Sequence, residues 1–173
     1  GAGALIGKHM DKVKAQAEAV QNAQVQSVTD ANGLQAVQVT FDSGILFQTG
    51  KSELSAAAKT SLNQFARDVL LPNQDCDVAI QGYTDNAGWK NSTAEQSAQK
   101  NLNLSQQRAQ AVTSYLQSMG VSAAQIRSTI GYGEANPVAD NATAAGKAKN
   151  RRVEVFLYAS LAMINAAEAG TLQ

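Results

Sequence analysis

The chain carries, from residue 76 to residue 88, the segment Cys76-Asp77-Val78-Ala79-Ile80-Gln81-Gly82-Tyr83-Thr84-Asp85-Asn86-Ala87-Gly88. Up to Gly82, apolar residues alternate with small or polar ones, which predicts a strand with one buried face. Asp85 follows the end of this strand. Downstream, apolar residues recur at helical spacing from Ala109 to Met119, so Arg108 is expected in the first turns of an amphipathic helix. A carboxylate and a guanidinium placed in this way suit a ligand that carries an ammonium group and a carboxylate close together.

Length and charge limit the possible functions. The 173 residues suffice for one domain with a sizeable core and an accessory segment. Because 14 basic residues balance 14 acidic ones, nothing favours binding to nucleic acid or to an anionic membrane surface. We therefore expect no nucleic-acid partner.

The sequence offers few residues for catalysis or metal binding. Cys76 is the only cysteine and falls in the apolar register of a strand, so we expect a buried structural thiol. His9 is the only histidine and lies in an N-terminal segment expected to be mobile. No catalytic triad or metal-ligand spacing can be assembled, so we expect no enzyme activity, metal or cofactor. A hydrolase using Asp85 and Glu134 as a carboxylate pair is the weaker alternative.

The chain begins with glycine, which we interpret as a processed or truncated chain with a targeting segment upstream. The apolar run 1–7 is much shorter than the roughly 20 residues that span a bilayer. It fits the tail of a glycine-zipper segment, but a disordered terminus is the favoured interpretation. Residues 11–24 predict a helix with a narrow apolar face, either packed on the domain or acting as a tether.

The remaining chain predicts alternating strands and helices. Strands are expected at 24–29 and 34–41, joined by an Asn32-Gly33 turn, and at 76–82, 126–132 and 152–158. Helices are expected at 55–71 and 102–119, with a loop at 133–150 and a short terminal helix after Leu161. The predicted fold is α/β (α+β), a two-layer βαβαββ sandwich whose mixed sheet carries helices on one face, plus an N-terminal helix and a β-hairpin. We divide the chain into an N-terminal segment at 1–33, the domain itself at 34–160 and a C-terminal tail at 161–173.

Three motifs resemble those of one known family. Gly82-Tyr83-Thr84-Asp85-Asn86, the helix start 101–109, and Asn150-Arg151-Arg152-Val153-Glu154 are similar to motifs of the OmpA-like C-terminal domain. That domain is the non-covalent peptidoglycan-binding module of Gram-negative envelope proteins, and the resemblance covers roughly residues 37–158. It implies a domain on the periplasmic face of the outer membrane, as in an outer-membrane lipoprotein, that anchors this membrane to the cell wall.

The resemblance also implies roles for individual residues. Asp85 would receive the ammonium group, and Arg108 the carboxylate, of the D-centre of diaminopimelate in the peptide stem. Asn101 would hydrogen-bond the same end, and Arg151 would line the pocket from the last strand. Thr84 belongs to the same site, and Leu104 would offer an apolar wall. The partners implied are peptidoglycan, the outer membrane through an upstream anchor, and possible envelope proteins.

Plainer structural roles stay open for several of these residues. Asp85 could only stabilise a turn, Arg108 could form a structural ion pair with it, and Asn101 could cap a helix. Arg152 alternates opposite to Val153, so we expect a solvated or structural side chain.

Two features depart from the family pattern. Tyr83 replaces the usual histidine, which we expect to change packing more than charge recognition. The segment 89–100 is longer than usual and would either form a lid, with Trp89 stacking on the ligand, or pad the rim. Padding is the favoured interpretation.

The alternative function is a structural envelope lipoprotein or secretion-system component that acts mainly through protein contacts. The apolar start of the chain and the helix predicted at 11–24 motivate it. In that case, deleting residues 1–24 would abolish a partner interaction and leave peptidoglycan binding intact.

Overall fold

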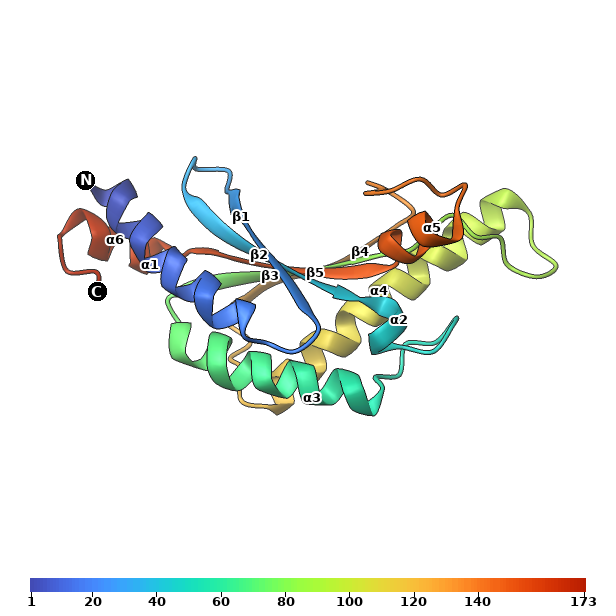
Figure 1. Ribbon diagram of the computed structural model, residues 1–173, viewed down its shortest axis with the longest axis horizontal. Coiled ribbons are helices and arrows are strands. Elements are labelled where there is room, and N and C mark those ends of the chain that lie inside the picture. The colour runs from blue at the N-terminus through green and yellow to red at the C-terminus, as the bar shows by residue number, and fades with distance from the viewer.

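The computed structural model describes residues 1–173, in which helices cover one face of a five-stranded sheet (Figure 1). The strands are β1 (Ala23–Thr29), β2 (Gln35–Asp42), β3 (Cys76–Tyr83), β4 (Ile126–Gly133) and β5 (Arg152–Ala159). The helices are α1 (Ala2–Glu18), α2 (Ser43–Leu46), α3 (Ala56–Phe65), α4 (Ala94–Ser118), α5 (Ala144–Asn150) and α6 (Leu161–Glu168). After α3 the chain continues through a π-helical turn (Ala66–Leu70) and a 3-10 turn (Leu71–Asn73). No helix in the structure has both the length and the apolar character needed to cross a bilayer.

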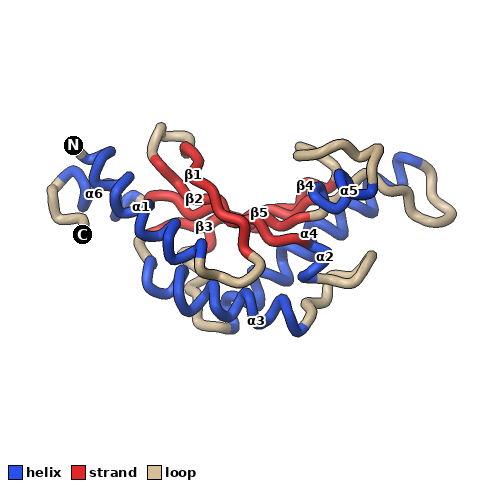
Figure 2. Tube along the Cα trace, in the orientation of Figure 1, coloured by secondary structure: helices blue, strands red, loops and turns tan.

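The strand order is β1-β2-β5-β3-β4. All neighbours pair antiparallel except β3 and β4, which are parallel and are connected through α4. This arrangement confirms the predicted mixed sheet. Figure 2 shows the strands as one twisted layer with α3 and α4 on the same side.

The core lies between this sheet and the helices. Val39 of β2, Val155 of β5 and Ile80 of β3 lie in paired positions and are fully buried. The ring of Phe41 meets that of Phe65 from α3 edge to face, with centroids 5.5 Å apart. Burial of such side chains is the main source of stability in a domain of this size.

The N-terminal helix differs from the prediction. It begins at Ala2 and ends at Glu18, so residues 2–7 are helical instead of disordered. The reason is packing, because Ile6, Met10 and Val13 form a buried stripe that joins the core. Each such side chain contributes about 1.5–3 kcal/mol when buried, which outweighs the low helix propensity of glycine.

The buried stripe also connects the two ends of the chain. Sγ of Cys76, which is buried as predicted, lies 3.9 Å from Sδ of Met10, and burial raises the pKa of the thiol. His9, expected to be mobile, has Nε2 3.3 Å from a carboxylate oxygen of Asp75 and Nδ1 2.7 Å from the backbone oxygen of Gln173. The termini lie at the same end of the molecule (Figure 1). The division of the chain at residues 33 and 160 stays a prediction.

Two other helices were missed or shortened in the prediction. The helix α4 begins at Ala94, eight residues before the predicted start, because Thr93 and Gln96 form a capping box. The predicted loop 133–150 contains α5, whose start is capped by the hydroxyl of Thr143. In Figure 1, α5 stands at the end of the sheet, apart from α3.

Close packing of α4 on the sheet positions the site. A Cβ atom on Gly82 would lie 2.4 Å from the backbone oxygen of Ser105, and one on Gly131 would lie 2.2 Å from the backbone nitrogen of Gln106. Only glycine permits this approach. The helix therefore lies directly against β3 and β4, which brings Arg108 close to the loop that follows β3.

Candidate functional site

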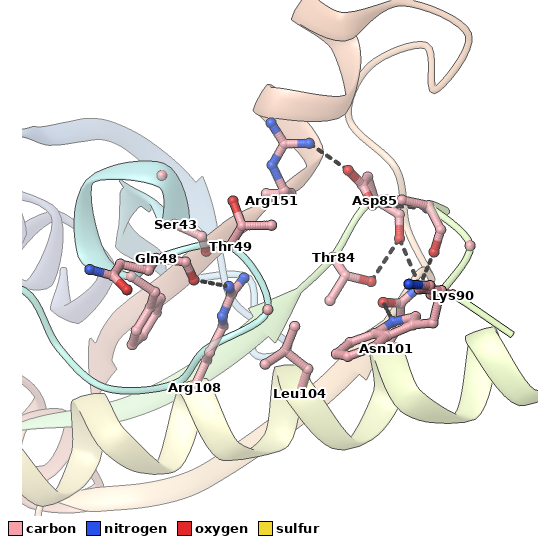
Figure 3. A pocket seen from close by; sticks show the side chains of 16 residues that line it. Ser43, Gln48, Thr49, Thr84, Asp85, Lys90, Asn101, Leu104, Arg108 and Arg151 are labelled. Atoms are coloured by element: carbon pink, nitrogen blue, oxygen red, sulfur yellow. Dashed lines mark hydrogen bonds and ion pairs between the residues drawn. The ribbon is translucent and has the colours of Figure 1, made fainter. Parts of the chain in front are cut away.

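One cavity of about 840 Å³ contains all six side chains that the sequence predicts as ligand contacts (Figure 3). They are Thr84, Asp85, Asn101, Leu104, Arg108 and Arg151. The cavity lies where β2 and β3 end and β5 begins, and α4 forms its floor in Figure 3. Its volume is within the range of about 300–1,000 Å³ that is typical of small-ligand sites. The structure thus brings these residues together, while their roles toward a ligand stay predictions.

Asp85 supplies the carboxylate of the cavity, and only 8% of its side chain is exposed. One oxygen accepts a hydrogen bond from the amide of Ala87 at 2.9 Å, which is the turn role considered above. The other oxygen forms a 2.5 Å ion pair with Nη1 of Arg151. The side chain of Arg151 is 39% exposed, so this partner can rearrange at low cost.

Arg108 supplies a buried cation. Its Nε donates to the carbonyl of Lys51 at 2.8 Å, and one Nη donates to the carbonyl of Gln48 at 3.2 Å. Its guanidinium carbon lies 4.9 Å from the ring centroid of Phe47. It forms no ion pair with any carboxylate, so the alternative of a structural pair with Asp85 is wrong.

The surroundings of Arg108 disfavour its charge. The pKa of Arg108 is lowered to about 10, first by burial and then by the positive charge of Arg151, while Asp85 acts in the opposite direction. The residue is only 4% exposed but lines the cavity. It remains protonated at neutral pH, as a cation whose contacts are backbone carbonyls and an aromatic ring. Such a group is suited to receive an anion.

Asn101 connects the walls of the cavity. Its Oδ1 accepts a hydrogen bond from Nε1 of Trp89 at 2.8 Å. Its Nδ2 donates to the carbonyl of Ala87 at 3.1 Å and to a carboxylate oxygen of Glu134 at 3.2 Å. Asn101 does not cap the helix, because α4 begins seven residues earlier. Its amide is occupied within the protein, and its contact with a ligand stays a prediction.

Thr84 and Leu104 complete the predicted set. The hydroxyl of Thr84 donates to the carbonyl of Asp85 at 2.8 Å and so fixes the turn. Leu104 is 8% exposed and lines the cavity from α4, and its contact with a ligand stays a prediction.

The long segment 89–100 contributes two residues to the cavity. Trp89 and Lys90 line it, and from Ala94 onward the segment is part of α4. Nζ of Lys100 lies 5.9 Å from the ring centroid of Trp89, at the outer limit of a cation–π contact. Trp89 is therefore a fixed wall residue in this structure, and its stacking on a ligand stays a prediction.

Several wall residues were not identified from the sequence. Phe47 and Ser43 come from the segment around α2, for which the sequence predicted neither a strand nor a helix. The hydroxyl of Ser43 is buried and has no hydrogen-bond partner in the protein. Unpaired buried polar groups are costly, so a ligand that reaches this hydroxyl would gain from it.

Asn150 positions the segment that carries Arg151. Its side-chain oxygen accepts hydrogen bonds from the amides of Val138 and Ala139 at 2.7 and 3.0 Å. Its amide nitrogen donates to the carbonyl of Ala139 at 2.9 Å. The signal was present in the sequence, because Asn150 opens the third motif, but its partners are 9–12 residues away and form no recognisable pattern.

Comparisons with known proteins agree with this geometry. A model described as the OmpA family matches residues 46–151. The Escherichia coli protein "Probable lipoprotein YiaD" is 36% identical over 155 residues, which are 90% of this chain and 65% of that protein. The Mycobacterium tuberculosis "Peptidoglycan-binding protein ArfA" is 41% identical over 122 residues, which are 70% of this chain and 34% of that protein. The chain therefore matches about two thirds of one relative and one third of the other.

A solved structure shares the fold. The cell wall anchor of the T6SS from Pseudomonas aeruginosa superposes with a TM-score of 0.67 at 26% identity, over 87% of this chain and 97% of that one. This agreement confirms the predicted α/β architecture.

Proposed function

Because this chain belongs to the OmpA family, we propose that it binds peptidoglycan non-covalently through the diaminopimelate of the peptide stem. In this role it would anchor the outer membrane to the cell wall from the periplasmic side. The observation that carries the proposal is Arg108, a buried guanidinium that has no carboxylate partner and lines a cavity together with Asp85.

The D-centre of diaminopimelate carries a carboxylate and an ammonium group, which complement Arg108 and Asp85. Its carboxylate would pair with Arg108, whose planar guanidinium can hold both oxygens. Its ammonium group would approach Asp85 and either share this carboxylate with Arg151 or displace it. The exposed position of Arg151 makes that exchange inexpensive.

The charge balance favours a ligand with a carboxylate. Lys90, Arg108 and Arg151 contribute three positive charges to the cavity lining, and Asp85 contributes one negative charge. A bound carboxylate would compensate part of this excess and stabilise the protonated form of Arg108. Lysine-type peptidoglycan lacks the D-centre and could not provide this pair of groups.

The names of similar proteins support peptidoglycan binding and an envelope location in general. One relative is named a peptidoglycan-binding protein, and one structure is described as a cell wall anchor. Relatives also include a lipoprotein and outer membrane proteins, which supports an envelope location. The hydrolase alternative requires Asp85 and Glu134 to act as a carboxylate pair. Asp85 is instead paired with Arg151, and Glu134 lies outside the cavity lining and accepts a hydrogen bond from Asn101.

The protein-contact alternative has lost its main motivation. It relied on the apolar N-terminal segment as a surface for partners, and the structure places the apolar side chains of that segment in the core. Deleting residues 1–24 would remove core packing and would not isolate a partner surface.

The proposal is tested by calorimetric titration with a diaminopimelate muropeptide and its lysine counterpart. We expect binding of the first only. Asp85→Ala and Arg108→Ala should each weaken binding by more than about tenfold, since either change leaves a charged ligand group unpaired. Arg108→Lys should recover only part of the loss because it lacks the planar fork. Equal binding of both muropeptides, or unchanged affinity in both alanine variants, would overturn the assignment.

A further inference from the structure

A second cavity, of about 410 Å³, lies on the face of the sheet opposite to the core and is bordered by α5. Its floor includes Gln26 of β1, Gln38 and Thr40 of β2, and Glu154 of β5. These residues face the same side because Gln26 pairs with Gln38 and Thr40 pairs with Glu154. Lys149 of α5 lies at the margin. We refer to this cavity as the sheet groove.

The sheet groove and the candidate site are separated by a thin ridge. Arg151 lines both cavities, and the consecutive residues Asp42 and Ser43 line one cavity each. The backbone amide of Ser43 donates to the carbonyl of Arg151 at 3.0 Å, which joins the two segments of the ridge. A ligand held beside Arg151 in the candidate site therefore needs to cross only this ridge to enter the sheet groove.

The charges of the sheet groove are mostly compensated within the protein. Arg152 and Glu154 form an ion pair at 2.6 Å, and Arg151 is paired with Asp85. Asp42 uses one carboxylate oxygen to accept the amide of Gly44 at 2.7 Å, which leaves the other for a donor. Lys149 is exposed and forms no ion pair.

The uncharged part of the floor carries amides and a hydroxyl. Nε2 of Gln26 donates to Oε1 of Gln38 at 3.0 Å, so the two amides form a cross-strand ladder with donors and acceptors to spare. Peptide N–H and C=O groups match such amides, Asp42 can accept a further N–H, and a carboxylate matches the free ammonium of Lys149. The lining thus suits a peptide that places a carboxylate next to Lys149.

We propose that the sheet groove binds the part of the peptide stem that precedes diaminopimelate, and that Lys149 pairs with the free carboxylate of its γ-linked glutamate. This inference rests on the proposed function, because the candidate site must first hold the diaminopimelate. It assigns to Arg151 a position between two segments of one ligand. It also predicts that the protein distinguishes acidic stems from amidated ones.

The experiment uses three ligands, which are free diaminopimelate, the tripeptide alanyl-γ-glutamyl-diaminopimelate, and the same tripeptide with the glutamate carboxylate amidated. Each is titrated at low ionic strength, because salt screens exposed pairs. The full chain should bind the acidic tripeptide about two- to fivefold more tightly than the amidated one, as expected for one exposed ion pair. Lys149→Gln should remove this difference and leave the affinity for free diaminopimelate unchanged.

Lys147→Gln is the matched control. It removes the same charge from the same helix, but Lys147 does not line the sheet groove. It should keep the preference for the acidic tripeptide. If free diaminopimelate binds but amidation or Lys149→Gln has no effect, the proposal for the sheet groove is overturned and that for the candidate site stands. Free diaminopimelate that fails to bind would overturn both proposals.

Discussion

Arg108 and Arg152 have similar surroundings, since both are buried, with 4% and 3% of each residue exposed. Each guanidinium lies over an aromatic ring, at 4.9 Å from the centroid of Phe47 and 3.9 Å from that of Tyr83. Each also donates to two backbone carbonyls. They differ in that Nε of Arg152 bonds a carboxylate oxygen of Glu154 at 2.6 Å, whereas Arg108 has no such partner.

This difference separates a structural site from a binding site. The charge of Arg152 is neutralised by Glu154 on the same strand, so the pair is complete without any ligand. The protein surrounds the charge of Arg108 with two backbone carbonyls and the ring of Phe47, and burial lowers the pKa of this guanidinium. A folded protein keeps a buried cation of this kind at a cost in stability, and an anionic ligand would offset that cost.

The largest expected effect concerns Arg152. Arg152→Met should reduce the free energy of unfolding by about 3–5 kcal/mol, because Glu154 would be left buried and unpaired. Arg108→Met should change it by less than about 1 kcal/mol, because no buried carboxylate loses a partner.

Urea denaturation of both variants measures the contrast. Arg127→Met is the control, because this side chain is exposed on β4. Equal losses for Arg108→Met and Arg152→Met would show that the two arginines are both structural.

The sequence identified Arg108 and Arg152 better than it identified the residues that they contact. Periodicity placed Arg152 on the face of the last strand opposite to Val153, and in the structure Val153 is part of the core while Arg152 pairs with Glu154 outside it. It could not show that this face is closed at Arg152 by Tyr83, which lies about seventy residues earlier in the chain. Local patterns fix the face of a residue, whereas its burial depends on which distant segment covers it.

The candidate site shows the same limit. The motifs identified Asp85, Arg108 and Arg151 as members of one cavity. They could not show that Asp85 pairs with Arg151 and leaves Arg108 free, because that choice depends on differences of a few ångströms in a low-dielectric pocket. Phe47 was missed because its short segment has no helical or strand period.

A pH titration sharpens the comparison at Arg108. Below pH 10 its guanidinium is charged in both the folded and the unfolded chain, so the cost of burying the charge is complete. Between the pKa of about 10 in the folded chain and the higher ordinary pKa of arginine in the unfolded chain, the unfolded chain binds the additional proton, so the stability contributed by this residue rises with pH.

The measurement is the difference in unfolding free energy between the natural chain and Arg108→Met, followed from pH 9 to pH 11. We expect the difference to shift in favour of the natural chain as the pH rises. Burial and Glu154 raise the pKa of Tyr83, which makes stability fall over the same range, but this contribution is common to both proteins and cancels. A difference that stays flat would mean that Arg108 is solvated as well as an exposed arginine.

The last expected effect concerns Tyr83, which by the resemblance stands where histidine is usual. Its ring stacks on that of Tyr132 at 5.4 Å and supports Arg152, and its hydroxyl donates to Oε1 of Gln81 at 2.9 Å. It does not line the cavity that contains Arg108. Tyr83→His should therefore reduce the free energy of unfolding by about 1 kcal/mol, through the lost hydrogen bond and poorer stacking.

The affinity for a diaminopimelate muropeptide separates the two regions in this variant. We expect it to stay within about twofold of the natural chain, because the contacts of Tyr83 belong to the Arg152 cluster. Tyr83→Phe, which keeps the ring and removes only the hydroxyl, distinguishes the hydrogen bond from the stacking. A loss of affinity of about tenfold in Tyr83→His, with stability unchanged, would place this residue in the binding site. The cluster around Arg152 would then not be separate from the site that contains Arg108.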